Sequence, residues 1–326
     1  MDIRLNRRSA LLAFATLALT TAGPEAIAQA AWKPERPVTL VVPYSAGGGT
    51  DAQARAVATE LQRIWGQAVI VENTPGADGA IGTRKVTEAK PDGYTLLVQL
   101  PSITLIKHVP GSKGFDPLAK LTPVSAFSAL PAVFVSNAKL PGRTLREVVD
   151  KCKAAVQPCS IGTTENTARL QAKQFSAEEG IKELTIVNYK GGGQLITDLV
   201  ANNVNMGIMG LTAALPHAKN GTLRILATFG SKRVPGIGDI PSTVEAGFPS
   251  YSATTWYGLF APMATPPAVV QAIANAVSEA VKGDAATKTF ANIGAQAIGD
   301  NPAEFSAIVK DESMRMDALA KRYPFE

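Results

Sequence analysis

The sequence predicts an α/β protein whose chain forms two lobes. Short apolar runs of β-type residues alternate with helical patterns along most of the 326 residues, which favours sheets built largely from parallel strands. Two long extended segments, 121–137 and 251–265, interrupt this alternation far apart in the chain. We interpret them as crossings between lobes, with lobe one at about 31–125 plus 258–326 and lobe two at about 126–257.

The strands are predicted where β-branched and apolar residues lie between turn residues. We expect strands at 38–42, 68–72, 94–99, 132–137, 184–188, 204–209 and 223–229. The helices are predicted from apolar positions spaced three and four apart and from capping patterns, such as Thr144 with Glu147 and Asn301 with Glu304. We expect helices after residue 50, after 144, at 167–179, at 194–202, after 266 and after 301.

The first thirty residues have the pattern of a secretory signal peptide. Basic Arg4, Arg7 and Arg8 precede an apolar run at 10–22, and Ala28-Gln29-Ala30 is a cleavage pattern. We therefore predict that 1–30 is removed and that the mature protein is periplasmic. The sequence leaves open whether export follows the general or the twin-arginine route.

Composition argues against several classes of partner. The net charge of +5 is modest and spread along the chain, without a dense basic run among aromatic residues, so nucleic acid is not expected. In an oxidising compartment the two cysteines, Cys152 and Cys159, favour a disulfide. Metal binding and redox catalysis are weaker alternatives, because the spacing is not CxxC and neither His108 nor His217 neighbours a suitable ligand.

The glycine-rich segment after the first strand is the strongest candidate site. Free N–H groups at a helix start, approached closely through glycine, favour an anion. Since the segment lacks both Gly-Lys-Ser/Thr and GxGxxG, we expect a small carboxylate and no nucleotide cofactor. The alternative is an ordinary turn with Thr50 or Asp51 as N-cap. The candidate residues are Tyr44, Ser45, Ala46, Gly47, Gly48, Gly49, Thr50 and Asp51.

Two further turns between a strand and a helix repeat this arrangement in lobe two. If all three turns converge on a cleft, backbone donors could hold a small carboxylate at both ends. A turn at 75–79 either closes one wall of the cleft or is a surface loop, and 101–123 forms a surface loop or the cleft rim. Trp256 and Tyr257 either line the cleft or pack at the hinge. The additional candidates are Gly76, Ala77, Ser102, Thr163, Thr164, Asn166, Gly191, Gly192 and Gly193.

No constellation of an enzyme is recognisable in the sequence. The GxSxG, HExxH and SxxK motifs with their partners are absent, and two histidines leave few ways to build a Ser-His-Asp triad. We therefore predict no catalytic residue, no metal and no cofactor.

The chain resembles the Bug-type, TctC-like periplasmic solute receptors of tripartite tricarboxylate transporters. The segments that carry this resemblance follow one another through nearly the whole mature chain. They are RPVTLVVPYSAGGGTDAQAR at 36–55, VIVENTPGADGAIGTRKVTEAKPDGYTLL at 69–97, YKGGGQLITDLVANNVNMG at 189–207, LPHAKNGTLRILATFGSKR at 215–233, IPSTVEAGF at 240–248, WYGLFAPMATP at 256–266 and NPAEFSAIVKDE at 301–312.

The resemblance implies a type II-like periplasmic binding fold with a ligand cleft between the lobes and two crossover segments. It also implies a permease of large and small membrane subunits, and ligand contacts at Ser45–Thr50, 163–166 and 191–193. The family's turn near 163 is rich in Gly and Ser, whereas this chain has Thr163-Thr164-Glu165-Asn166. Glu165 is unfavourable beside a ligand carboxylate unless it faces away or pairs with Arg169.

The resulting hypothesis is a monomeric receptor that captures a small carboxylate and delivers it to the permease. The ligand could be an aliphatic di- or tricarboxylate or an aromatic carboxylate. Two alternatives are a sensor that presents its ligand to a membrane kinase and, more remotely, an exported hydrolase on the same fold.

Overall fold

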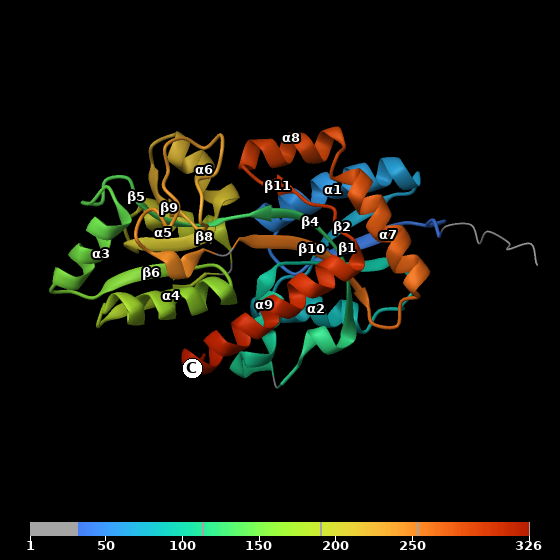
Figure 1. The fold of residues 1–326 in the computed structure, drawn as a ribbon, viewed down its shortest axis with the longest axis horizontal. Coiled ribbons are helices and arrows are strands. Elements are labelled where there is room, and N and C mark those ends of the chain that lie inside the picture. Colours follow the sequence, from blue (N-terminus) through green and yellow to red (C-terminus); the bar gives the residue numbers. More distant parts are fainter. Residues whose placement is uncertain (1–31, 113, 190, 253, 326) are drawn as a thin grey trace, which may run out of the picture. The chain divides into compact units, whose positions relative to one another are not determined.

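The computed structural model describes residues 32–112, 114–189, 191–252 and 254–325. The predicted signal peptide, 1–30, lies outside the described residues. The described chain contains a six-stranded sheet in the order β11-β4-β10-β3-β1-β2 (Figure 1). Its strands are β1 (Val38–Val42), β2 (Val69–Asn73), β3 (Thr95–Gln99), β4 (Leu121–Leu130), β10 (Thr255–Pro262) and β11 (Gln296–Ala297).

A second sheet has five strands in the order β7-β6-β8-β5-β9. These strands are β5 (Ala132–Asn137), β6 (Cys159–Thr163), β7 (Leu184–Asn188), β8 (Met206–Gly210) and β9 (Leu223–Thr228). Together the sheets and their helices confirm the predicted α/β fold class.

The two predicted crossings are strands, and they make the sheets mixed. Segment 121–137 is β4 in the first sheet and β5 in the second, separated by Pro131. The chain returns to the first sheet through β10, which pairs antiparallel with both β3 and β4. β5 likewise runs antiparallel to β8 and β9. The expectation of largely parallel sheets is therefore wrong for these strands, because parallel pairing is confined to β1 with β2 and β3 and to β6 with β7 and β8.

Most helices come after a strand in the chain, although β4 is followed by β5 and α7 by α8 (Figure 1). The Asn301 capping box at the start of the last helix is confirmed. The sequence analysis missed three helices, one of which carries Pro216 in its interior, where proline argues against a helix. The helices are α1 (Gly49–Trp65), α2 (Ala80–Thr87), α3 (Leu145–Ala154), α4 (Asn166–Glu179), α5 (Gly192–Val200), α6 (Leu211–Lys219), α7 (Pro267–Ala280), α8 (Asp284–Ile293) and α9 (Pro302–Arg322).

The core is apolar on both faces of the first sheet. Alternate residues of β1 point to opposite sides, so that Leu40 joins the cluster beneath α1 while Val41 joins Phe260 and Phe305 on the other face. In the second sheet, the ring of Phe134 on β5 packs centrally among other buried aromatic rings. These helix-covered sheets hold the loops at the strand ends in fixed positions.

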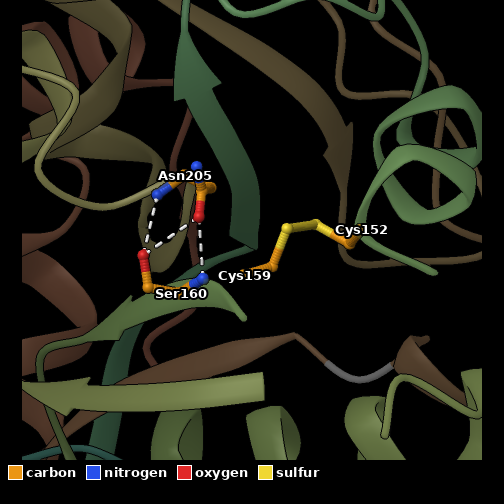
Figure 2. Close-up of a disulfide and its surroundings, with 4 residues drawn as sticks. All are labelled: Cys152, Cys159, Ser160 and Asn205. Carbon is orange, nitrogen blue, oxygen red and sulfur yellow. Dashed lines mark hydrogen bonds between the residues drawn. A yellow bond between two sulfur atoms is a disulfide. The ribbon is translucent and has the colours of Figure 1, made fainter. Parts of the chain in front are cut away.

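The disulfide between Cys152 and Cys159 is present, with sulfur atoms 2.14 Å apart. It joins the last turn of α3 to the first residue of β6. Figure 2 shows that the next residue, Ser160, is held by Asn205, whose Oδ1 accepts hydrogen bonds from the Ser160 N–H at 2.8 Å and hydroxyl at 3.1 Å. The disulfide and this hydrogen-bonded pair together fix the start of β6, the strand that leads to Glu165.

Removing the disulfide should lower the free energy of unfolding by about 2–3 kcal/mol, because the cross-link closes a short loop in the unfolded chain. We expect this loss in a Cys152→Ser/Cys159→Ser variant compared with the oxidised wild type in urea denaturation. Dithiothreitol should destabilise the wild type by a similar amount and leave the double variant unchanged. Equal stability of the oxidised wild type and the double variant would contradict the prediction.

Candidate ligand-binding site

A cavity of about 610 Å³ lies where loops from both sheets meet. From the first sheet its wall contains the loop Tyr44–Thr50 after β1, together with Leu100, Thr255 and Tyr257. From the second sheet it contains residues at the ends of β6 and β8 and at the starts of the following helices. The volume is in the range of pockets that enclose a small organic molecule.

Within the described residues, four helices begin at the wall of this cavity: α1, α4, α5 and α6. Three of them have a glycine as N-cap, namely Gly48, Gly191 and Gly210, and none of these three has a side chain capping it. The first N–H groups of a helix have no acceptor within the helix, and the helix dipole makes its N-terminus electropositive. The cavity is thus lined by main-chain donors suited to an anion.

The start of α1 lies close to the start of α6. A side chain at Gly49 would bring its Cβ to 3.4 Å from Cβ of Thr212, whose hydroxyl is buried and has no hydrogen-bond partner among the described residues. Thr212 also lines the cavity. The first residue of α1 and the side chain of Thr212 on α6 are therefore neighbours on the cavity wall.

Helix α4 differs from the other three because its N-cap is a carboxylate. The two oxygens of Glu165 accept hydrogen bonds from the N–H groups of Thr167 at 2.7 Å and Ala168 at 2.8 Å. Glu165 is half-buried and lines the cavity, whereas Arg169 lies 5.3 Å over the ring of Phe325. Burial, with a smaller contribution from the nearby charge of Asp78, raises the pKa of Glu165 to about 7, against the lowering effect of these hydrogen bonds.

Asp51 lies behind the glycine loop and holds it in place. Its carboxylate accepts hydrogen bonds from the Gly47 N–H at 2.9 Å, Arg55 Nε at 3.1 Å and Asn73 Nδ2 at 3.0 Å. Burial raises the pKa of Asp51, but these hydrogen bonds and the Arg55 charge outweigh it and hold the pKa below the ordinary value. The N-cap of α1 is Gly48, so the expectation of Thr50 or Asp51 as N-cap is wrong.

The hydroxyl of Tyr44 is hydrogen-bonded to buried polar side chains. Its hydroxyl is 2.7 Å from Ser102 Oγ and donates to Gln99 Oε1 at 3.0 Å. Ser102 and Gln99 are fully buried, and burial raises the pKa of the Tyr44 hydroxyl, which therefore stays protonated. Ser102 thus positions a residue of the wall.

The structure brings most of the predicted site residues to one cavity. The wall contains Tyr44, Ser45, Ala46, Gly47, Gly48, Gly49, Thr50, Thr164, Gly191, Gly192 and Gly193. Besides Asp51 and Ser102, the predicted residues that do not line it are Gly76, Ala77, Thr163 and Asn166. Thr163 is buried at the end of β6, and the side chain of Asn166 is buried without a hydrogen-bond partner among the described residues.

The wall also contains residues that the sequence analysis did not select. Tyr257 lines the cavity, whereas Trp256 packs edge-on against Phe305 at 5.1 Å. A largely apolar stretch comes from β8, α5 and α6, and Gly210 before α6 is the sequence signal that could have identified it. The additional residues on this side are Gln194, Ile196, Ile208, Met209, Gly210, Thr212, Ala213, Pro216 and His217.

In the part of the chain that the structure describes, no cluster of three or more His, Cys, Asp or Glu side chains is placed to hold a metal ion. No helix in the same residues has the length and apolar character needed to cross a bilayer.

The raised pKa of Glu165 predicts a pH-dependent stability. A carboxyl that binds its proton more tightly when folded contributes stability at low pH, which is lost as pH rises through the folded pKa of about 7. We expect the melting temperature of Glu165→Gln to rise relative to that of wild type between pH 5 and pH 8. Glu183→Gln, in the exposed turn before β7, should show no such trend. A difference between Glu165→Gln and wild type that stays constant with pH would contradict the assignment.

The fold and the cavity together define a solute-binding receptor. A family model described as "Tripartite tricarboxylate transporter family receptor" (TctC) matches residues 53–324, and the chain belongs to this family. Among curated relatives, it is similar to Protein BugT of Bordetella pertussis, with 32% identity over 321 residues, 95% of this chain and 96% of the relative. The chain is therefore a TctC/Bug-type periplasmic solute receptor.

Solved structures agree with this family assignment. The periplasmic binding protein BugD superposes with a TM-score of 0.82 at 27% identity, over 89% of this chain and 98% of BugD. R. palustris Rpa4515 with adipate gives a TM-score of 0.83 at 30% identity, over 88% and 97% of the two chains. MatC from Rhodopseudomonas palustris with bound malate gives 0.81 at 26% identity, over 88% and 99%.

Proposed function

We propose that this receptor captures a small organic carboxylate in the periplasm and delivers it to the large and small membrane subunits of a tripartite permease. The observation that carries the proposal is the convergence of three helix starts without side-chain caps on one cavity. The adipate and malate complexes of the similar proteins support a carboxylate as the bound group.

In this proposal the ligand carboxylate lies between the loop Ser45–Thr50 and the starts of α5 and α6. Main-chain N–H groups bind it, and Thr212 adds a hydroxyl. The two sheets belong to lobes that close on the ligand through the crossing strands β4 and β10. The receptor acts as a monomer after removal of its signal peptide and performs no chemistry on the ligand.

The proposal is tested by binding measurements on the mature protein, stripped of ligand by unfolding and refolding. The panel contains aliphatic di- and tricarboxylates, ω-amino and half-amide carboxylates, and aromatic carboxylates, each paired with an uncharged analogue. At one hundred times the dissociation constant a ligand adds about 2.7 kcal/mol of stability, a shift of several degrees. We expect at least one carboxylate to produce this shift and its uncharged analogue none. Folded protein that binds no carboxylate would overturn the proposal.

A further inference from the structure

Glu165 is the N-cap of α4 and lies on the wall of the cavity. The N–H groups of Thr167 and Ala168 at the start of α4 are already hydrogen-bonded to its two oxygens, at 2.7 and 2.8 Å. The N-termini of α1, α5 and α6 have no such side chain. One of the four helix starts is therefore closed to an external anion.

The charge around Glu165 also disfavours a second anion. The described lining of the cavity contains no lysine or arginine, and its histidine, His217 on α6, makes no ion pair with Glu165 among the described residues. The carboxylate of Asp78 is close enough to Glu165 to add like charge at this place. A second ligand carboxylate placed at this end would face like charge in a partly desolvated site, which is unfavourable unless one group takes up a proton.

A hydrogen-bond donor is the complementary group for this end of the cavity. Each oxygen of Glu165 accepts one of these hydrogen bonds and can accept a second, because a carboxylate oxygen has two acceptor sites. Apolar Ile196, Met209 and Pro216 on the adjoining wall suit a short hydrocarbon spacer.

Building on the proposed function, we propose that the ligand is a monocarboxylate with a nitrogen-borne hydrogen-bond donor at its other end, and that Glu165 is the residue that selects it. The carboxylate binds at the starts of α1 and α6, and the N–H group binds Glu165. An amide and an ammonium share this chemistry, and the ammonium additionally neutralises the Glu165 charge.

The test compares ligands of equal length that differ only at the second end. For chains of four, five and six carbons, the probes are the dicarboxylate, its half-amide and the ω-amino carboxylate, titrated calorimetrically at pH 8 into stripped wild-type protein. We expect the half-amide or the ω-amino acid to bind at least 10-fold more tightly than the dicarboxylate of the same length. A preference for the ω-amino acid alone would identify charge neutralisation as the main effect.

Two variants test whether Glu165 causes the preference for a ligand with a hydrogen-bond donor. Glu165→Gln removes the charge and keeps an oxygen that can cap α4, so the preference over the dicarboxylate should fall to about 2-fold or less. Glu165→Gly frees the N–H groups of Thr167 and Ala168, so the dicarboxylate should become the tighter ligand. Glu183→Gln, at an exposed position outside the cavity, should keep the wild-type ratio.

The outcomes separate this inference from the proposed function. Wild-type protein that binds dicarboxylates as tightly as the half-amides and ω-amino acids would overturn the inference and leave the carboxylate receptor intact. An unchanged preference in Glu165→Gln would also overturn it. Folded wild-type protein that binds no member of the wider carboxylate panel would overturn the proposed function, and the inference with it.

Discussion

Replacing Gly49 with proline is expected to weaken carboxylate binding about 10- to 100-fold, the effect of losing one hydrogen bond to a charged group. Gly49 is the first residue of α1, where proline is well tolerated and removes only an N–H group that the helix does not use. The preceding Gly48 already has the extended ψ of 170° that a residue before proline requires. The change in affinity is measured by titration calorimetry with the tightest carboxylate of the panel.

The matched control is Asp284→Pro at the first position of α8. Its N-cap, Gly283, is also extended, with a ψ of 160°, and neither residue lines the cavity. We expect both variants to unfold within about 1 kcal/mol of wild type and only Gly49→Pro to lose affinity. Wild-type affinity in a folded Gly49→Pro protein would show that this N–H group does not bind the ligand.

Truncation of Phe134 to alanine is expected to cost about 3–5 kcal/mol of unfolding free energy, as a fully buried aromatic residue at the centre of a cluster. Its ring lies 4.8 Å from Phe175, 4.9 Å from Phe229 and 5.6 Å from Tyr251, measured between centroids. Because these residues come from α4, from the residue after β9 and from the segment before β10, no single neighbour can fill the space. Urea denaturation measures the loss.

Phe134→Leu is the control, since it keeps most of the side-chain volume and should cost clearly less than Phe134→Ala. The two variants distinguish cavity formation from a general intolerance of substitution in β5. Equal losses in both would show that ring contacts, rather than volume, stabilise this part of the sheet. A loss below 1 kcal/mol in Phe134→Ala would contradict the assigned role in the core.

Local sequence patterns predicted much of the fold correctly because local physical chemistry determines these elements. Strand Val38–Val42 matches the prediction residue for residue, and the Asn301 capping box starts α9 as expected. Helix α6 was missed because Pro216 argues locally against a helix that tertiary packing nevertheless stabilises. The antiparallel pairing of β4 with β10 joins segments more than a hundred residues apart, which no local pattern specifies.

The candidate site was predicted in part for the same reason. Glycine-rich turns after strands located the starts of α1 and α5 at the cavity. Whether a side chain caps the start of a helix depends on its rotamer and on the neighbouring loops. The sequence therefore raised the question of Glu165 but could not show that its carboxylate turns back onto the Thr167 and Ala168 N–H groups.

The main-chain and side-chain hydrogen-bonding groups of the cavity differ in how they respond to mutation. An N–H group of the main chain is present whichever amino acid is encoded, and among the standard residues only proline removes it. The donors at the starts of α1, α5 and α6 are therefore insensitive to most single substitutions that fit sterically. Glu165 is a side chain, and one nucleotide change in a glutamate codon can turn it into glycine or glutamine. Single substitutions can therefore remove the hydrogen-bonding group of a wall side chain such as Glu165, whereas they leave most of the main-chain donors in place.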